Sequence, residues 1–410
     1  MSKSFPQTRM ISVVALAMVL SLPGVAATVT NHYSKTKSQT ITESARTKKK
    51  MSQTRHSRPV ATTAHHATVH RASLRTKRRH YYYERFVGNS YADNQTAGDV
   101  VGGEDPVVRQ AAIDALGNMN GTVVAVDPNS GRILAMVNQG LALSEGATPC
   151  STIKLSVALS ALSEGIITED TKVNVGGGWK LNLTEALAHS NNAYFEALGR
   201  QLGFEKVSYY AHQFGLGELA GYNIPGEHLG TYPTEVLPEN EGGVGKMCSF
   251  GESVNMTPLQ LAAMVSAIAN GGTLYYLQHP ETPEEVASFQ PRVKRHLDIE
   301  AQIPEILNGM AGAVRYGTAR SVRYSFNEEE ILGKTGTCSR DGIRFGWFAS
   351  YANTQYGKIV TVIFLHGGRA TFGPKAAELS GHFYRELYDH DFFAAKPAVM
   401  DRGSALGASQ

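Results

Sequence analysis

The sequence predicts a mixed α/β fold in which strands from both ends of the folded region build one sheet beside a helical subdomain. Two apolar segments within 122–137 flank a turn rich in Asp, Pro, Asn and Gly, which predicts a hairpin. Two further segments of strand character, 345–351 and 359–365, come more than two hundred residues later. Most segments between them have the apolar spacing of helices. Distant segments are therefore expected to complete one sheet, with a separate layer of helices.

The individual elements follow from local patterns. A helix is expected over 106–116, because Asp105 suits a helix N-cap and apolar residues recur three to four positions apart. Strands over 122–126 and 132–137 form the first hairpin, and the folded region begins near Gly102. Further helices are expected over the stretches 151–165, 184–203, 257–270, 301–314 and 375–389.

Charge divides the chain into two parts. The 410 residues carry a formal net charge of +3, but residues 1–85 contain sixteen Lys and Arg against two acids, about +14. The remaining residues are about −11 by the same count. This asymmetry and the composition predict four regions: an export segment over 1–27, a basic linker over 28–100, a catalytic domain over 101–392 and a disordered tail over 393–410.

The N-terminal region predicts export. Lys3 and Arg9 precede an apolar run from Met10 to Leu20, and small residues follow before position 28. The run is shorter than the roughly 20 residues that span a bilayer, so a cleaved signal peptide is expected, with an uncleaved anchor as the alternative. We therefore expect the catalytic part in the periplasm or on the outer face of the cytoplasmic membrane.

The region 28–100 is rich in Ser, Thr, Lys, Arg and His and poor in aliphatic residues, which predicts disorder. Such a polycation is expected to contact anionic lipid headgroups or acidic wall polymers. Export argues against a nucleic-acid partner. The irregular histidine spacing predicts a solvated linker and no metal site.

Ser151 and Lys154 stand three residues apart at the start of a predicted helix, which places a hydroxyl and an amine on one face. Pro149 is typical of a helix start, so Ser151 is expected in the first turn, where its N–H is free and the helix dipole favours negative charge. A lysine base at neutral pH needs its pKa lowered by ~3 units through burial and a neighbouring cation. We predict that Ser151 is a nucleophile and Lys154 its base.

The neighbouring cation is expected to be Lys334, the first residue of a Lys-Thr-Gly-Thr segment at the end of an apolar run. Thr335 and Thr337 offer hydroxyls to a substrate carboxylate. Gly336 permits close approach of a substrate to the backbone. The backbone N–H of Thr337 is the expected second oxyanion donor, beside that of Ser151.

The ordered motifs Ser-x-x-Lys, Ser-x-Asn (Ser190 and Asn192) and Lys-Thr-Gly resemble those of the transpeptidase domain of penicillin-binding proteins, among the serine acyl-enzymes that include β-lactamases. The resemblance covers about 105–390. Ser-x-Asn also occurs at 253–255 and 325–327, but the first directly precedes another family-like stretch and the second crowds the Lys-Thr-Gly strand. The stretches that carry the further resemblance are 121–137, 257–262 with 269–272, 317–320 and 347–348.

The resemblance implies a five-stranded antiparallel sheet flanked by helices, with the site between the sheet and an all-helical subdomain. It implies that Ser151 attacks the D-Ala-D-Ala carbonyl of a peptidoglycan stem peptide while Lys154 takes its proton. Ser190 passes a proton to the leaving D-alanine, assisted by Lys334, and Asn192 orients the substrate amide and Lys154. An amine (transpeptidation) or water (carboxypeptidation) then resolves the acyl-enzyme. β-Lactams are expected to acylate the same serine, and no metal or organic cofactor is needed.

Two alternatives remain open. Class A β-lactamases carry a deacylating glutamate in a Glu-x-x-x-Asn pattern, which is absent between residues 193 and 334. A class D-like β-lactamase that relies on its lysine fits the motifs better. The third reading is a non-catalytic sensor or wall-binding protein, which the intact set of Lys, Ser and Thr residues disfavours.

Cysteines flank both main motifs: Cys150 precedes the predicted nucleophile and Cys338 follows Lys-Thr-Gly-Thr. Transpeptidases of this family typically have glycine before the serine. Some class A carbapenem-hydrolysing enzymes, which this chain resembles here, pair cysteines at these positions. The resemblance implies a Cys150–Cys338 disulfide that braces the oxyanion hole and leaves Cys248 free, and export permits it. Two buried thiols are the alternative.

Overall fold

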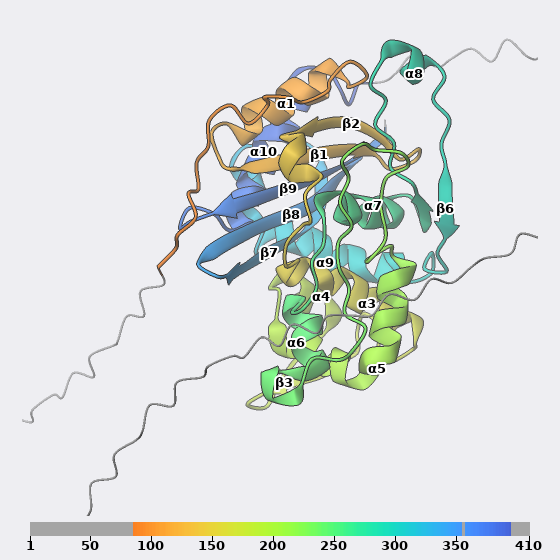
Figure 1. The fold of residues 1–410 in the computed structure, drawn as a ribbon. Helices are drawn as coiled ribbons and strands as arrows, with labels where there is room; N and C mark the ends of the chain where they lie inside the picture. The colour runs from red at the N-terminus through yellow and green to blue at the C-terminus, as the bar shows by residue number, and fades with distance from the viewer. Residues whose placement is uncertain (1–84, 355–356, 395–410) are drawn as a thin grey trace, which may run out of the picture. The chain divides into compact units, whose positions relative to one another are not determined.

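A five-stranded antiparallel sheet forms the centre of the folded region, with strand order β2-β1-β9-β8-β7 (Figure 1). The computed structural model describes residues 85–354 and 357–394. The expected export segment, most of the basic linker and the tail from 395 onward lie outside these residues. Within the described ranges, no helix is both long enough and apolar enough to cross a bilayer. The sheet consists of β1 (Gly121–Asp127), β2 (Arg132–Val137), β7 (Glu330–Arg340), β8 (Ile343–Thr354) and β9 (Gly357–Gly367).

The two-residue period of the strands divides the core into two layers. Val123 and Ala125 of β1 belong to a cluster on one face of the sheet, whereas Val124 and Val126 belong to a cluster on the other. In β8, Phe348 joins the first cluster and its neighbours join the second. Both faces are thus buried, which explains why the strands read as nearly continuous apolar runs.

Helices α1 (Pro106–Leu116) and α10 (Gly373–Asp389) pack on one face of the sheet. The predicted cap of α1 is confirmed: the Asp105 side chain accepts hydrogen bonds from the backbone N–H groups of Val107 and Val108. The opposite face is covered by α7 (Pro258–Ala269), which begins with a capping box between Thr257 and Gln260.

The helical subdomain lies beside the sheet on the α7 side (Figure 1). Its helices pack in the pairs α3 with α5, α5 with α6 and α4 with α9. They are α3 (Lys154–Ser163), α4 (Leu183–Ala188), α5 (Asn192–Gln213), α6 (Gly243–Phe250) and α9 (Ile303–Arg315). The remaining elements are α2 (Gln139–Ala142), α8 (Pro283–Ala287), β3 (Val173–Gly176) paired with β4 (Trp179–Leu181), β5 (Thr273–Tyr275) paired with β6 (Val293–His296), and the 3₁₀ turns η1 (Cys150–Ile153), η2 (Glu239–Glu241) and η3 (Arg320–Tyr324).

The expected single helix over 184–203 was wrong. The chain forms α4, leaves the helix at His189 and begins α5 at Asn192. Ser190 between them has a φ of 55°, which a helix does not allow. Asn191 restarts the helix by accepting a hydrogen bond from the N–H of Tyr194. The break therefore releases Ser190 from the helical conformation.

The ordered region also extends beyond its expected limits at both ends. Residues 85–100 were assigned to the disordered linker, yet Ser90 is buried and its hydroxyl accepts a hydrogen bond from the N–H of Gly368. Asp99 forms an ion pair with Arg109 of α1. At the other end, Phe393 is buried in the core beside α10. Polar contacts hold residues 85–100 in place. The sequence prediction missed this order because it relied on the low content of apolar residues.

Candidate active site

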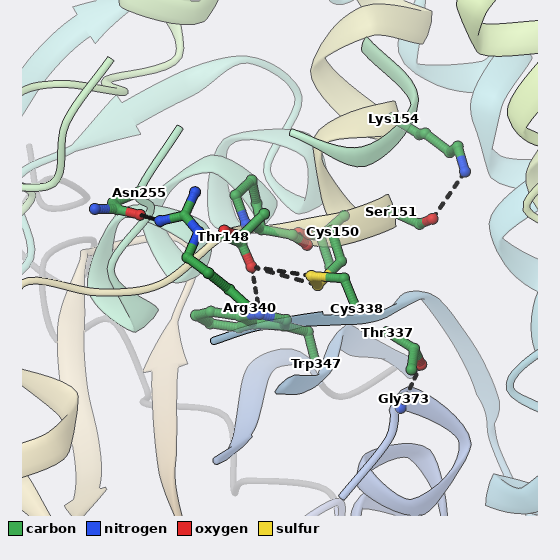
Figure 2. The surroundings of a disulfide bond; sticks show 12 residues. Thr148, Cys150, Ser151, Lys154, Asn255, Thr337, Cys338, Arg340, Trp347 and Gly373 are labelled. Carbon is green, nitrogen blue, oxygen red and sulfur yellow. Dashed lines mark hydrogen bonds between the residues drawn. A yellow bond between two sulfur atoms is a disulfide. The ribbon is translucent and has the colours of Figure 1, made fainter. Parts of the chain in front are cut away.

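Ser151 lies in the 3₁₀ turn η1 directly before α3, between the sheet and the helical subdomain. It was expected in the first turn of an α-helix, so the sequence located the helix start correctly but not its tighter geometry. The indole N–H of Trp347 on β8 donates to the carbonyl of Thr148 at 3.0 Å. This bond ties the chain leading into η1 to the sheet (Figure 2).

Lys154 is fully buried, and its Nζ lies 2.8 Å from Ser151 Oγ. The same nitrogen lies 2.7 Å from Asn192 Oδ1 and 3.0 Å from the carbonyl oxygen of Ser190. Burial lowers the pKa of Lys154 to about 7, against an opposing effect of the Glu196 carboxylate. A substantial fraction of this lysine is therefore a neutral amine at pH 7, with a lone pair beside the serine hydroxyl.

Ser190 connects the two lysines. Its Oγ lies 3.3 Å from Lys154 Nζ and 2.8 Å from Lys334 Nζ. The positive φ at Ser190 and the helix restart at Asn191 present both the hydroxyl and the carbonyl of Ser190 to these amines. Ser151, Lys154, Ser190 and Lys334 thus form one continuous chain of polar contacts.

Lys334 reaches the site because successive side chains of β7 point to opposite faces of the sheet. Leu332 lies in the core cluster shared with the helical subdomain, and Lys334, two residues later, projects from the same face of the strand. Its side chain is fully buried. Burial lowers the pKa of Lys334 well below its ordinary value, and the positive charge of Lys154 lowers it further. The two lysines meet at one site as expected, but the pKa of Lys154 is lowered by burial and not, as expected, by Lys334 as a neighbouring cation.

The hydroxyls of Thr335 and Thr337 both have protein partners. Thr335 Oγ1 donates to Thr318 Oγ1 at 2.7 Å. Thr337 Oγ1 accepts from the N–H of Gly373 at the start of α10, at 2.7 Å, which leaves its own hydrogen free to donate (Figure 2). Thr318 is a candidate site residue that sequence reasoning missed. Its signal was present, since it belongs to the family-like stretch 317–320.

Gly336 has a structural role beside the expected one of letting a substrate approach the backbone. A Cβ built on Gly336 would lie 2.8 Å from the carbonyl oxygen of Pro149 and 3.2 Å from Thr152 Cγ2. The backbone that approaches this glycine is therefore the protein's own turn η1. This close approach brings the strand of Lys334 against the turn of Ser151.

A disulfide joins Cys150 to Cys338, with a Cα–Cα distance of 5.6 Å. These residues directly adjoin Ser151 and Thr337, whose backbone N–H groups we expect to form an oxyanion hole. Figure 2 shows the disulfide between η1 and β7. Cys248 is a free thiol, buried in α6. Within the described ranges, no group of three or more His, Cys, Asp or Glu side chains is placed to hold a metal ion.

Comparison with known proteins places these features in a family context. The family model for the penicillin-binding protein transpeptidase domain matches residues 121–387. The stage V sporulation protein D of Bacillus subtilis is 29% identical over 266 residues, which are 53% of this chain and 39% of that protein. The peptidoglycan D,D-transpeptidase PbpA of Mycolicibacterium smegmatis is 26% identical over 72% of this chain and 74% of its own.

Solved structures agree on the fold. The D,D-transpeptidase domain of a peptidoglycan glycosyltransferase from Eggerthella lenta superposes with a TM-score of 0.56. It is 20% identical in sequence, and the match covers 70% of this chain and 82% of that one. This likeness supports the five-stranded antiparallel sheet with flanking helices. The match with this chain covers only about two fifths of the Bacillus relative, so the activity of that whole protein does not carry over to this chain by similarity alone.

Proposed function

The chain belongs to the penicillin-binding protein transpeptidase family, and we propose that it is a D,D-transpeptidase or D,D-carboxypeptidase that acts on peptidoglycan stem peptides through an acyl-serine. The observation that carries the proposal is the continuous polar chain from Ser151 through Lys154 and Ser190 to Lys334. It supplies a nucleophile, a base and a proton donor within hydrogen-bonding distance of one another.

The first step is attack by Ser151 Oγ on the carbonyl carbon between the two terminal D-alanines. The neutral amine of Lys154, 2.8 Å away, accepts the hydroxyl proton as the C–O bond forms. The backbone N–H groups of Ser151 and Thr337 are the proposed donors to the oxyanion. Their spacing is supported by the Cys150–Cys338 disulfide and by the contact between Gly336 and Pro149.

The second step breaks the peptide bond and releases D-alanine. Its nitrogen needs a proton, which Ser190 Oγ donates and regains from the Lys154 ammonium 3.3 Å away. Lys334, 2.8 Å from the same oxygen, stabilises Ser190 as it loses its proton. Thr318 and Thr337 accept hydrogen bonds from Thr335 and from the N–H of Gly373, so they can direct their own hydroxyl hydrogens to the terminal carboxylate of the leaving residue.

The third step frees Ser151 from the acyl group. An amine of a second stem peptide gives a cross-link, whereas water gives the shortened stem. Lys154 acts as the base again, and the 2.7 Å contact with Asn192 Oδ1 holds its nitrogen toward Ser151. Because Lys154 and Lys334 are buried, this proton exchange takes place away from bulk solvent.

The proposal is tested by incubating the protein with a stem pentapeptide ending in D-Ala-D-Ala, with and without an amine acceptor. We expect one D-alanine released per acyl transfer and a cross-linked product when the acceptor is present. Hydrolysis of nitrocefin with steady turnover and no D-alanine release would instead identify a β-lactamase. If neither acylation nor D-alanine release occurs, the chain is a non-catalytic binding protein.

We further propose that the catalytic domain works outside the cytoplasm, on the evidence of the N-terminal sequence and of relatives named for peptidoglycan synthesis. The basic residues before position 85 would then contact anionic lipids or wall polymers. Binding of the full chain to anionic vesicles, with loss of binding at high salt, tests this contact. Equal binding to neutral vesicles would contradict it.

A further inference from the structure

The hydroxyl of Thr337 is held by the start of α10, and the inference that follows rests on the proposed function. Thr337 Oγ1 accepts a 2.7 Å hydrogen bond from the N–H of Gly373, the first residue of α10 (Figure 2). One lone pair of this oxygen is thereby engaged, so the hydroxyl hydrogen points away from the helix. The position of Gly373 therefore sets the direction in which Thr337 donates.

The backbone around Gly373 packs directly on the sheet. Gly346 of β8 is the cross-strand partner of Thr337. A Cβ built on Gly346 would lie 2.7 Å from the backbone carbonyl carbon of Phe372, and a Cβ built on Gly373 would lie 2.7 Å from the carbonyl oxygen of Gly336. Residues 372 and 373 thus rest on the part of the sheet that carries Thr337, with no side chain between them and the strands.

Phe372 is the N-cap residue of α10, and its side chain makes no capping hydrogen bond. Its ring packs instead against the guanidinium of Arg344 on β8, whose Cζ lies 5.4 Å from the ring centroid. The same Cζ lies 5.5 Å from the ring centroid of Phe86. Both distances are within the roughly 6 Å at which a cation is attracted to an aromatic face. Arg344, Phe86 and Phe372 together form the Arg344 brace.

Hydrogen bonds fasten the loop before α10 to the same brace. Arg344 Nη1 donates to the carbonyl oxygen of Arg369 at 3.1 Å. On the N-terminal side, the N–H of Val87 donates to the carbonyl oxygen of Gly342 in the β7–β8 turn at 2.8 Å. Ser90 Oγ accepts hydrogen bonds from the Thr371 hydroxyl and the Gly368 N–H in the loop before α10. Segments from opposite ends of the folded region are therefore joined beside the residue that orients Thr337.

We propose that Arg344 is a positioning residue for acyl transfer. By packing against Phe372 it holds Gly373 on Thr337, so that the Thr337 hydroxyl donates to the carboxylate of the leaving group. Arg344 is the cross-strand partner of Ser339, two residues beyond Thr337, and its guanidinium contacts protein groups. It therefore acts through Thr337 and does not bind the carboxylate itself. Phe86, the second ring of the brace, contributes in the same way from the N-terminal segment.

Two thioester donors that differ in the charge of the leaving group test this role. Both carry the same N-acyl-D-alanyl group, but one releases thioglycolate, which has a carboxylate, and the other releases the neutral thioglycolamide. Arg344→Gln should lower kcat/KM for the anionic leaving group about 10-fold, the cost of weakening one hydrogen bond to a charged group, and change the neutral donor less than about twofold. Arg344→Lys, which keeps a cation at the rings, should restore part of the loss. Phe86→Leu should give an intermediate loss.

A double-mutant cycle with Thr337→Ala shows whether the effect passes through this hydroxyl. Thr337→Ala removes the hydroxyl and keeps the backbone N–H. In this background, Arg344→Gln should cause no further loss of preference for the anionic leaving group. Additive losses from the two substitutions would show that Arg344 binds the carboxylate directly. Equal losses for both donors would show a role in stability alone. Either result would overturn the proposal.

Arg292→Gln is the matched control, because Arg292 is an exposed arginine just before β6 that also lies over a ring, 4.1 Å from the centroid of Tyr222. It should keep the wild-type ratio of the two donors. Stoichiometric labelling of Ser151 by a penicillin tests the proposed function separately, and both Arg344→Gln and the wild type should reach it. Normal labelling with an unchanged donor ratio in Arg344→Gln would overturn the positioning role alone. Failure of the wild type both to be labelled and to turn over either thioester would overturn the proposed function and the positioning role with it.

Discussion

Replacing Lys154 with methionine separates the catalytic role of this buried amine from its effect on stability. Methionine has a similar length and no basic nitrogen, so the cavity stays filled while the base 2.8 Å from Ser151 Oγ is lost. A general base contributes about 10²–10⁴-fold in rate. We therefore expect acylation by a labelled penicillin to slow by about that factor, on the order of 3–5 kcal/mol in activation free energy.

The free energy of unfolding should respond differently. The pKa of Lys154 is about 7 in the folded protein and near 10.5 when unperturbed, so the unfolded chain binds more protons between these values. Wild-type stability must then rise with pH across this window, and the full penalty of burial is present below pH 7. At ~1.36 kcal/mol per pKa unit, the wild type should gain roughly 2 kcal/mol relative to Lys154→Met between pH 7 and pH 9.

Urea denaturation at the two pH values measures this difference, and stopped-flow acylation measures the rate. Lys206→Met is the matched control, because Lys206 is half exposed on α5 and pairs with Glu164. It should change neither the rate nor the pH dependence of stability. Acylation of Lys154→Met within about threefold of wild type would refute the assignment of the base. Parallel stability profiles for wild type and Lys154→Met would refute the lowered pKa.

Three further predictions concern the same site. The acylation rate of the wild type should rise with pH and be half-maximal near pH 7, where Lys154 loses its proton; a rate that is flat or falls from pH 5.5 to 8.5 contradicts this. Gly336→Ala should cost about 1–3 kcal/mol of stability and slow acylation, because its Cβ would lie 2.8 Å from the Pro149 carbonyl oxygen; a rate equal to wild type would show that this approach is unimportant. Cys338→Ser should lower the free energy of unfolding by about 2–5 kcal/mol, since the disulfide closes a separation of 188 residues; equal denaturation midpoints for this variant and wild type under non-reducing conditions would argue against the bond in solution.

The strands of the central sheet were predictable because both of their faces are buried. Segments such as Val123–Val126 alternate between two apolar clusters, so every side chain is hydrophobic and the run is visible in the sequence. The short pairs β3–β4 and β5–β6 lack this signal. Trp179 in β4, for example, is 74% exposed, and three to four partly exposed residues give no periodicity.

The site was less predictable where tertiary contacts override local preference. The side chains of Ser151 and Lys154 lie next to each other, as their three-residue spacing predicted, although η1 is a 3₁₀ turn. At Ser190, no glycine marks the positive φ, and the local signal for the break is the Ser-Asn-Asn cluster 190–192, in which Asn191 caps the new helix. In this conformation the carbonyl and the hydroxyl of Ser190 contact the amines of Lys154 and Lys334. The cap at Asn191 is a local signal that the prediction of one helix overlooked, whereas the contacts of Ser190 with the two lysines depend on residues far away in the sequence.

The central claim, that Ser151 is the nucleophile of an acyl-enzyme, is tested most directly by mass spectrometry after incubation with a penicillin. The account predicts one penicilloyl adduct on the wild-type protein, located on the peptide that contains Ser151 and Lys154, and no adduct on Ser151→Ala. The disulfide should be reduced only after digestion, so that η1 keeps its geometry during acylation. A stoichiometric adduct on Ser151→Ala, or a wild-type adduct on another serine, would contradict it.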